Sequence, residues 1–263
     1  MEYALTTNQL TKEYGKYKSL DELSIHIPKG SIYGLVGKNG AGKTTLIRVI
    51  CGLQEPTKGT YSIYGIKNTS KAIVKSRRRM GAVVETPAIY LNMSAEENLK
   101  LQCLSVGVPS YDSVPEILEL VGLAKTGRKK AGHFSLGMKQ RLGIAMALVG
   151  NPDFLVLDEP VNGLDPQGII ELRELILKLN REYQITVLIS SHILDELSRL
   201  ATHYGFVNDG RLIKEISEEQ TIEKVAYIWF NRFIALRFMD VNHYTKIGVV
   251  SPVEGQTQPE VLS

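Results

Sequence analysis

The apolar positions of the chain fall into two kinds of run, which together predict an α/β protein. Short and nearly unbroken apolar stretches occur at residues 31–36, 80–85, 154–157 and 185–189. Such stretches are typical of strands buried on both faces of a parallel sheet. By contrast, residues 167–180 place apolar side chains three and four positions apart, which predicts a helix that packs on that sheet.

Further β-like segments lie on either side of the first predicted helix. Residues 3–10 and 23–27 have strand character, and the polar residues 11–22 between them predict a loop. These strands predict a small antiparallel sheet that packs on the main one. Residues 59–66 predict a pair of strands that turns at Gly65.

From residue 94 to residue 149 the pattern is helical. Ser94 precedes this segment with Glu97 three positions later, an arrangement that predicts a capping box. Helix breakers divide the segment into several helices, at 108–110 and at Gly122. Because a strand follows at residue 154, we expect a helical subdomain, about residues 88–150, inserted into the α/β core.

The chain is predicted to contain one domain, residues 1–217, and an atypical tail, residues 218–263. A hairpin at 204–215 is expected to end the domain. In the tail, residues 227–236 are rich in aromatic side chains and residues 251–263 have the composition of a disordered segment. The tail is either a segment that binds a partner or a membrane surface, or a truncated or frame-shifted end.

Composition narrows the function only slightly. Lys and Arg number 31 against 28 Asp and Glu, a net charge of +3, which does not favour a dedicated nucleic-acid-binding protein. No run of about 18 apolar residues is present, so we expect a soluble chain that reaches a membrane only by docking on another subunit. Cys51 and Cys103 lack metal-ligand spacing, which favours structural roles in a reducing compartment.

A glycine-rich loop between the first buried strand and a helix predicts a phosphate site. Glycines let successive backbone N–H groups converge on a phosphate, and the following helix adds the positive end of its dipole. Lys43 is expected to reach the β- and γ-phosphates, and the Thr44 hydroxyl can bind Mg²⁺. A glycine-rich turn that binds nothing is disfavoured by the strand–loop–helix context. The predicted nucleotide-binding residues of this loop are Gly37, Lys38, Asn39, Gly40, Ala41, Gly42, Lys43, Thr44 and Thr45.

Three polar residues follow two other buried strands. Asp158 and Glu159 end the strand at 154–157, and His192 comes shortly after the strand at 185–189. Ligands bind at the carboxyl ends of strands in open α/β sheets, so these side chains are expected to share one site. Asp158 would then hold Mg²⁺ and Glu159 would polarise the attacking water. The alternatives are ordinary surface carboxylates and a structural histidine.

Tyr14 is a candidate for contact with a nucleotide base. It precedes Gly15, and an aromatic ring there could stack on a purine. An aromatic side chain that covers the sheet edge is the other interpretation.

Residues 134–141, Phe-Ser-Leu-Gly-Met-Lys-Gln-Arg, lie between the phosphate loop and the acidic strand. They resemble the signature motif, usually Leu-Ser-Gly-Gly-Gln, of the nucleotide-binding subunits of ATP-binding-cassette (ABC) transporters. The resemblance covers roughly residues 3–217. It implies a P-loop NTPase (RecA-like) core with a mostly parallel sheet, whereas a phosphate loop alone would leave many ATPase and GTPase families open.

The resemblance also implies roles for individual residues. Two copies, in a homodimer or a heterodimer, would face each other head to tail around ATP and Mg²⁺, and would hydrolyse ATP to power a separate transmembrane permease. The subunit would then be cytoplasmic and peripheral on the inner face of the cell membrane, with no nucleic acid expected as partner. By similarity, Tyr14 would stack on adenine and residues 37–45 would form the Walker A loop. Asp158 would be the magnesium aspartate, Glu159 the catalytic glutamate and His192 the switch histidine. Ser135 and Gly137 would close on the γ-phosphate held by the partner copy, and Asp165 would lie at the dimer seam.

Some residues depart from the family pattern. Glu85 stands where the family has a glutamine, at the entry to the helical subdomain, and a carboxylate there could still bind a cation or water but repels the γ-phosphate. In the signature motif, Leu136 and Met138 replace a glycine and a glutamine. This form is similar to cassettes of the bacitracin- and lantibiotic-resistance type, which implies export of a peptide antibiotic or a lipid-like substrate.

Two other functions remain open from the sequence. One is a non-transport ABC ATPase of translation or DNA repair, although such chains usually carry two cassettes or a long coiled-coil insertion. The other is a regulatory module that binds nucleotide without hydrolysing it, which the acidic residue at position 85 leaves possible.

Overall fold

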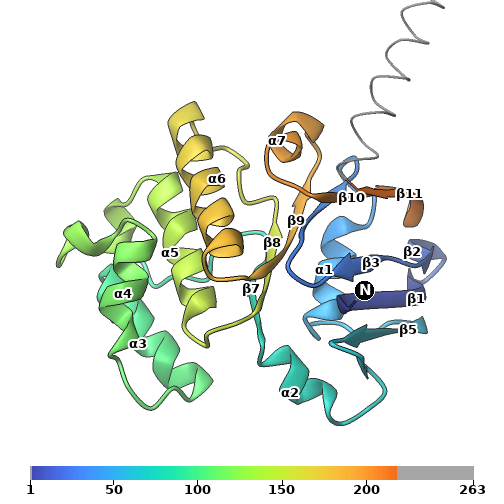
Figure 1. Ribbon diagram of the computed structural model, residues 1–263, viewed down its shortest axis with the longest axis horizontal. Helices are drawn as coiled ribbons and strands as arrows, with labels where there is room; N and C mark the ends of the chain where they lie inside the picture. The colour runs from blue at the N-terminus through green and yellow to red at the C-terminus, as the bar shows by residue number, and fades with distance from the viewer. Residues whose placement is uncertain (1, 218–263) are drawn as a thin grey trace, which may run out of the picture. The chain divides into compact units, whose positions relative to one another are not determined.

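The computed structural model describes residues 2–217 (Figure 1). The predicted tail, residues 218–263, lies outside the described residues, as do the segments 227–236 and 251–263 within it. The division into a domain and a tail therefore stays a prediction.

The main sheet has six strands in the order β11-β10-β4-β9-β8-β7. From β10 to β7 every neighbouring pair is parallel, as the apolar runs predicted. All side chains of β8 and β9 are buried, since both faces of the sheet are covered there. The strands are β4 (Ile32–Val36), β7 (Met80–Val83), β8 (Phe154–Asp158), β9 (Thr186–Ser191), β10 (His203–Asn208) and β11 (Arg211–Ser217).

The second sheet is antiparallel and is built mostly from the N-terminal segment. Its order is β2-β1-β5-β6, with β3 paired to β1, so the predicted antiparallel sheet is confirmed. The predicted strand pair that turns at Gly65 is confirmed as β5 and β6. The strands are β1 (Tyr3–Tyr14), β2 (Tyr17–Leu23), β3 (His26–Pro28), β5 (Lys58–Ile63) and β6 (Ile66–Lys67).

The loop predicted at residues 11–22 is wrong, because β1 and β2 form a hairpin over most of these residues. The two strands pair from Leu10↔Leu23 to Tyr14↔Tyr17, with two shifts of register between these ends. A register shift breaks the strict alternation of buried and exposed side chains, which hid the strand pattern. The strand predicted at 23–27 is also divided, since β2 ends at Leu23 and β3 begins at His26.

Helix α1 (Lys43–Ile50) lies between the two sheets and contacts both β8 and β2. Leu46 and Ile47 of this helix are fully buried, together with Leu20 from the antiparallel sheet and Phe154 from the main sheet. The hydrophobic core therefore fixes the position of the helix that follows the glycine-rich loop. Helices α6 (Pro166–Arg181) and α7 (Leu194–Ser198) contact β9 of the main sheet, whereas α2 (Ile73–Arg77) contacts β5 and β6 of the antiparallel sheet.

The helical pattern after residue 94 is confirmed (Figure 1, green). Ser94 and Glu97 form the predicted capping box at the start of α3. The backbone N–H of Ser94 and the Lys130 ammonium both donate to the Glu97 carboxylate, which lowers the pKa of Glu97 to about 2. The segment contains α3 (Ala95–Val106), α4 (Ser113–Leu120) and α5 (Leu136–Leu148), with short 3₁₀ turns at Ala124–Thr126 and Ala131–His133.

Helix α5 is tied closely to the main sheet. A Cβ atom at Gly81 of β7 would lie 2.3 Å from the carbonyl oxygen of Ala147, and one at Gly143 would lie 2.5 Å from Pro87. Only glycine permits such an approach. The helix that carries the signature-like sequence is thus packed against both β7 and the segment that follows it.

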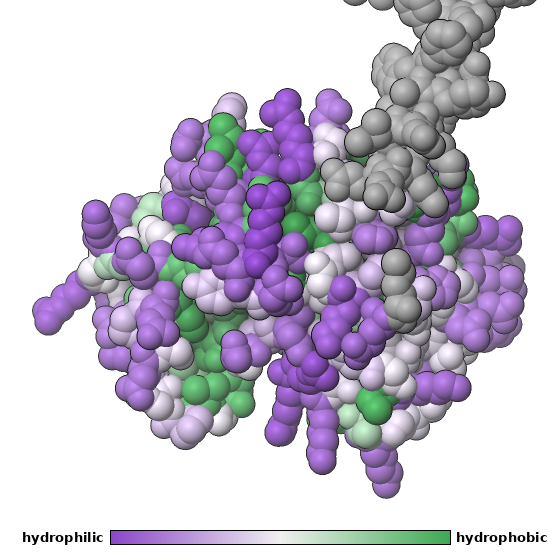
Figure 2. All heavy atoms as spheres, in the orientation of Figure 1, coloured by the Kyte–Doolittle hydropathy of each residue, from purple (hydrophilic) through white to green (hydrophobic). Residues whose placement is uncertain are grey.

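The surface is largely polar, but hydrophobic side chains gather over the α3–α5 segment (Figure 2, left). Leu104 and Val106 of α3, and Leu91 shortly before this helix, are each at least half exposed. In residues 2–217 we find no helix with the length and apolar character that a bilayer crossing requires. Cys51 and Cys103 are free thiols, and burial raises the pKa of Cys51 to about 12, so this thiol stays protonated at neutral pH.

Candidate functional site

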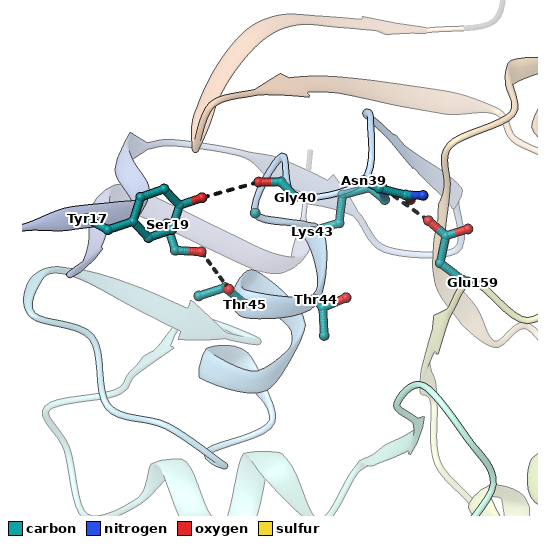
Figure 3. A pocket seen from close by; sticks show the side chains of 9 residues that line it. Tyr17, Ser19, Asn39, Gly40, Lys43, Thr44, Thr45 and Glu159 are labelled. Carbon is teal, nitrogen blue, oxygen red and sulfur yellow. Dashed lines mark hydrogen bonds and ion pairs between the residues drawn. The ribbon is translucent and has the colours of Figure 1, made fainter. Parts of the chain in front are cut away.

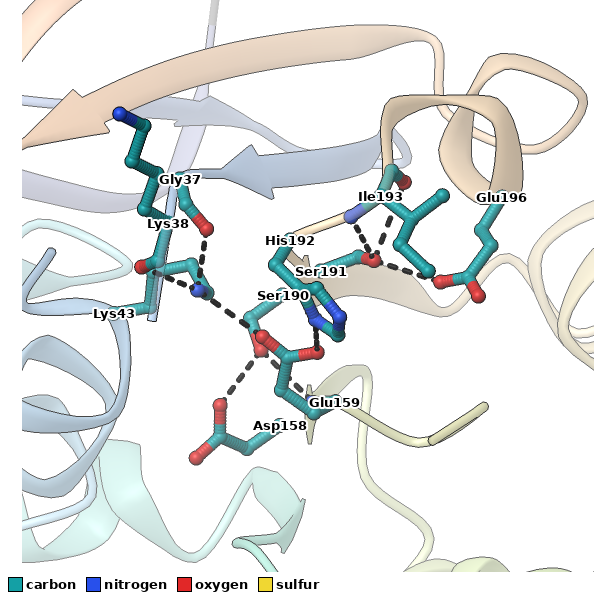
Figure 4. A network of polar contacts seen from close by, with 10 residues as sticks. All are labelled: Gly37, Lys38, Lys43, Asp158, Glu159, Ser190, Ser191, His192, Ile193 and Glu196. Carbon is teal, nitrogen blue, oxygen red and sulfur yellow. Dashed lines mark hydrogen bonds and ion pairs between the residues drawn. The ribbon is translucent and has the colours of Figure 1, made fainter. Parts of the chain in front are cut away.

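Three adjacent strands bring the predicted polar residues to one edge of the main sheet. Strand β9 lies between β4 and β8, and all three run in the same direction. The glycine-rich loop leaves β4, Asp158 and Glu159 end β8, and His192 follows β9. Their carboxyl ends therefore meet, as the sequence predicted, and the side chains form one polar network (Figure 4).

The glycine-rich loop takes a conformation that depends on its glycines. Gly40 and Gly42 have φ values of 81° and 105°, which other residues rarely adopt. A Cβ atom at Gly42 would also lie 2.4 Å from the carbonyl oxygen of Ser19. Gly37 is needed for a different reason, the lack of room for a side chain. A Cβ atom there would lie 2.5 Å from the Val207 carbonyl oxygen.

The loop ends at the open N-terminus of α1. No side chain caps this terminus, and the first turn contains no acidic residue. Backbone N–H groups in the first turn of a helix have no partner within the helix, and the helix dipole favours an anion there. The terminus is therefore suited to bind phosphate.

A cavity of about 220 Å³ opens beside this helix terminus (Figure 3). The hydroxyl groups of Ser19 and Thr45 are hydrogen-bonded across it at 2.7 Å, and the Tyr17 hydroxyl donates to the carbonyl oxygen of Gly40 at 3.5 Å. The antiparallel sheet thus contributes one wall of the cavity. The lining residues are Tyr17, Ser19, Asn39, Gly40, Gly42, Lys43, Thr44, Thr45 and Glu159.

Lys43 is buried and already has three partners. Its ammonium donates to the carbonyl oxygens of Gly37 and Lys38, at 2.6 and 3.1 Å, and lies 3.1 Å from the carboxylate of Glu159 (Figure 4). A phosphate entering the cavity would therefore compete with Glu159 for this charge. The side chain of Lys38 points away from the network, so its part in the site is its carbonyl group.

Glu159 connects Lys43 to His192. One carboxylate oxygen of Glu159 faces Lys43, and the other lies 2.7 Å from Nδ1 of His192. The backbone of Glu159 has a φ of 49°, an uncommon value for a residue with a side chain. Strained backbone of this kind clusters at functional sites, where the surrounding structure holds it in place.

Asp158 is buried and is held by a serine hydroxyl, not by a charged partner. It is 1% exposed, and one carboxylate oxygen accepts a hydrogen bond from the Ser190 hydroxyl at 2.6 Å. The same hydroxyl accepts the backbone N–H of Glu159 at 2.8 Å. The other carboxylate oxygen of Asp158 is buried without a hydrogen-bond partner among the described residues.

A second cavity, of about 500 Å³, adjoins the first. Thr44 and Glu159 line both cavities, and Asp158 lines the second. A buried carboxylate oxygen without a partner, in a cavity that a threonine also lines, fits a divalent cation. In residues 2–217 no group of three or more His, Cys, Asp or Glu side chains could hold a metal alone, so further ligands would have to come from a nucleotide or water.

Glu85 also lines the second cavity, but its carboxylate is engaged elsewhere. It follows β7 with a φ of 58° and forms an ion pair with Arg48 of α1, at 2.5 Å. The metal role expected of Glu85 stays a prediction.

Tyr14 lines neither cavity. Its hydroxyl donates to the amide oxygen of Gln54, and the ammonium of Lys12 lies 5.3 Å from the ring centroid. The next aromatic residue of the hairpin, Tyr17, lies at the cavity instead. Base stacking by Tyr14 therefore stays a prediction.

The remaining predicted residues lie at two exposed helix starts. Ser135 caps α5 by accepting the N–H of Met138, and Asp165 caps α6 by accepting the N–H of Gly168. Gly137 lies in the first turn of α5, and a Cβ atom there would have no neighbour closer than 3.9 Å. Ser135 and Asp165 are exposed, so another molecule can reach both.

Sequence reasoning missed Ser190, Ser19 and Tyr17. Ser190 carried a usable signal, since it is a polar residue at the end of an apolar strand that leads to His192. Ser19 and Tyr17 carried none, because their place beside the cavity depends on a hairpin that the sequence did not predict.

Comparisons with known proteins agree with this geometry. The family model described as ABC transporter matches residues 20–162. The bacitracin transport ATP-binding protein BcrA of Bacillus licheniformis is 49% identical over 216 residues, which are 82% of this chain and 70% of that protein. The lantibiotic transport ATP-binding protein SrtF of Streptococcus pyogenes is 41% identical over 223 residues, which are 84% of this chain and 95% of that protein.

Solved structures confirm the fold. The protein cbiO1 of Clostridium perfringens, part of an ABC transporter complex, superposes with a TM-score of 0.78 at 26% identity, over 94% of this chain and all of that one. A dimeric ATP-binding cassette in a post-hydrolysis state, bound to ADP and Pi, superposes with a TM-score of 0.72 at 25% identity, over 81% of this chain and 98% of that one.

Replacement of Ser190 tests whether its hydroxyl holds Asp158 and Glu159 in place. Replacing Ser190 with alanine leaves one oxygen of Asp158 and the N–H of Glu159 without partners, which should lower the free energy of unfolding by about 1–3 kcal/mol. Misplacement of the two acids should also lower ATP turnover by roughly 10- to 100-fold. Chemical denaturation and phosphate release measure the two effects.

Ser105→Ala is the matched control, because the Ser105 hydroxyl bonds only to its own helix on an exposed face. It should change stability by less than about 0.5 kcal/mol and leave turnover unchanged. Equal behaviour of the two variants would contradict the role of Ser190.

Proposed function

This chain belongs to the ABC transporter family, and we propose that its site at the carboxyl ends of β4, β8 and β9 binds magnesium ATP and hydrolyses it between two cassettes. As a member of that family the chain is an ATP-binding subunit, related to bacitracin and lantibiotic transport ATPases. The assignment of individual residues, of the cation, of the dimer and of the substrate is our proposal.

One observation carries the assignment of the phosphate site. The uncapped N-terminus of α1 and the ammonium of Lys43 face the same cavity as the carboxylate of Glu159. The helix terminus and Lys43 would attract the triphosphate, and Glu159, which lines the same cavity, is the residue proposed to orient the attacking water.

Thr44 and Asp158 are the residues proposed to hold Mg²⁺. The Asp158 oxygen without a partner supports this choice, because a buried carboxylate oxygen is otherwise costly to leave unpaired. When bound, the ion would neutralise charge on the β- and γ-phosphate oxygens. Ser190 holds the other Asp158 oxygen, and so fixes the carboxylate in the wall of the cavity that Thr44 also lines.

ATP binding is proposed to change the partner of Lys43. In the structure Lys43 is paired with Glu159, and a triphosphate at the helix terminus would draw Lys43 to its own oxygens. The freed Glu159 oxygen can then accept a hydrogen bond from water, while His192 holds the other oxygen. Glu159 therefore becomes available to orient water only when nucleotide is present.

A second cassette is proposed to complete the site. The dimeric relative with ADP and Pi supports a dimer, and the exposed starts of α5 and α6 provide the contact surface. Ser135 caps α5, whose first turn offers N–H groups and a helix dipole to an anion. The partner copy can be a second copy of this chain or a related cassette.

The names of the relatives support a proposal for the transported substrate. We propose that the subunit docks on a separate membrane permease at the inner face of the membrane, and that the permease moves a peptide antibiotic of the bacitracin or lantibiotic class. The names of BcrA and SrtF support this substrate class. The hydrophobic side chains that gather over the α3–α5 segment support a protein partner on that side (Figure 2). Leu104 and Val106 of α3 are exposed hydrophobic side chains of this segment.

Replacing Glu159 with glutamine should separate binding from hydrolysis. An uncharged amide competes less for Lys43, so ATP should bind at least as tightly as to the wild type. Turnover should fall by roughly 100-fold or more, because the amide cannot polarise water as a carboxylate does. ATP titration and phosphate release test both, with the exposed Glu182→Gln as control. Wild-type turnover in Glu159→Gln would remove Glu159 from its assigned role.

Replacing Gly137 with alanine should affect only the contact between cassettes. A Cβ atom at Gly137 meets nothing closer than 3.9 Å within the chain, and alanine favours a helix by about 1 kcal/mol over glycine. Introduced into Glu159→Gln, the substitution should preserve folding and ATP binding but abolish the ATP-dependent dimer, as measured by light scattering.

Gly150→Ala in the same background is the control, because a Cβ atom there also has no near neighbour. It should dimerise normally with ATP. A stable ATP-dependent dimer of the Gly137→Ala protein would show that close approach at Gly137 is not needed.

A further inference from the structure

We infer that Arg48 is a positioning residue of the nucleotide site, which neutralises Glu85 and holds its carboxylate away from the bound phosphates. The inference rests on the proposed function, because it concerns the same cavity. It explains how a chain with an acidic residue at position 85 can still bind a polyphosphate anion.

The geometry comes from helix α1 and the segment after β7. The Arg48 guanidinium lies 2.5 Å from the carboxylate of Glu85. Arg48 is four residues after Thr44 in α1, so the two side chains share one face of the helix, about 6 Å apart along its axis. The Glu85 carboxylate is thus held one helical turn beyond the terminus that faces the cavity.

The backbone of Glu85 indicates that this position is imposed by the surrounding structure. Its φ of 58° is uncommon for a residue with a side chain. Glu85 lies where β7 leads into the helical segment, and Pro87, two residues later, packs closely on Gly143 of α5. The side chain is therefore directed to Arg48 from a segment that is fixed at both ends.

The charged side chains that line the second cavity are all acidic. Three carboxylates line this cavity, those of Glu85, Asp158 and Glu159. With ATP bound, Lys43 is proposed to move to the phosphates while His192 keeps its contact with Glu159, and Asp158, held by Ser190, faces the proposed cation. Arg48 is the partner of Glu85, so without it an uncompensated negative charge would face the phosphates.

Folding stability is a weaker explanation for the pair. The side chains of Arg48 and Glu85 are 38% and 55% exposed, and ion pairs with such exposure contribute little to stability. The two charges can still act on an anion in the adjoining cavity. At that short range, within about one Debye length, salt screens them only in part.

A double-mutant cycle tests the inference by ATP binding in EDTA, without metal and without turnover. Arg48→Gln should weaken ATP binding by about 3- to 10-fold at low ionic strength. Glu85→Gln should bind ATP as tightly as the wild type or slightly more tightly. The double variant should return to within about twofold of the wild type, because the repelling carboxylate is gone. Isothermal titration measures all four proteins, after thermal melts establish that each is folded.

Lys100→Gln is the matched control. The Lys100–Glu96 pair has nearly the same exposure, 44% and 55%, but lies in α3. Its loss should leave ATP affinity unchanged. The loss in Arg48→Gln should also shrink when the ionic strength is raised, since salt screens exposed charges.

Two results would overturn the inference. Wild-type affinity in Arg48→Gln would show that Glu85 needs no compensation. A double variant as weak as Arg48→Gln would show that Arg48 acts on the nucleotide and not through Glu85. Either result leaves the proposed function intact, whereas a wild-type protein that binds no ATP in EDTA and none with Mg²⁺ would remove both.

Discussion

The parallel pairing of β4, β9 and β8 is the constraint on which the site depends. Val36 lies opposite Ser191, and Asp158 lies opposite Ser190, so the three strands end at nearly the same level. The loop after β4, the two acids at the end of β8 and His192 after β9 therefore converge, because each lies directly at the end of its strand. Helix α1 is fixed in the core between the two sheets, and its open terminus faces this edge of the sheet.

At this edge each acidic side chain has at least one polar partner. Lys43 pairs with Glu159, Glu159 also contacts His192, and Asp158 is held by the buried Ser190. The Asp158 oxygen without a partner supports the proposed cation site, and the Lys43–Glu159 pair is the contact that we propose the triphosphate replaces. Glu159, which we propose as the catalytic carboxylate, is thus engaged by Lys43 and His192 in the structure, and we propose that bound ATP takes Lys43 from it.

Local sequence patterns were sufficient to predict the fold class, the glycine-rich loop and the meeting of Asp158, Glu159 and His192. These predictions rest on short motifs and on the rule that ligands bind at the carboxyl ends of parallel strands. Contacts between distant segments were not predictable. Ser19 reaches the loop only through the hairpin of β1 and β2, whose register shifts hide the strand pattern, and Arg48 meets the residue at position 85 only after the sheet has formed.

The central claim is that a triphosphate takes Lys43 from Glu159. A crystal structure of the wild-type chain with Mg²⁺ and a non-hydrolysable ATP analogue tests it most directly. We expect the γ-phosphate between the start of α1 and Glu159, with the Lys43 ammonium on phosphate oxygens and the Glu159 carboxylate free to hold a water. A triphosphate bound elsewhere, or a Lys43–Glu159 pair that persists beside the bound analogue, would contradict the claim.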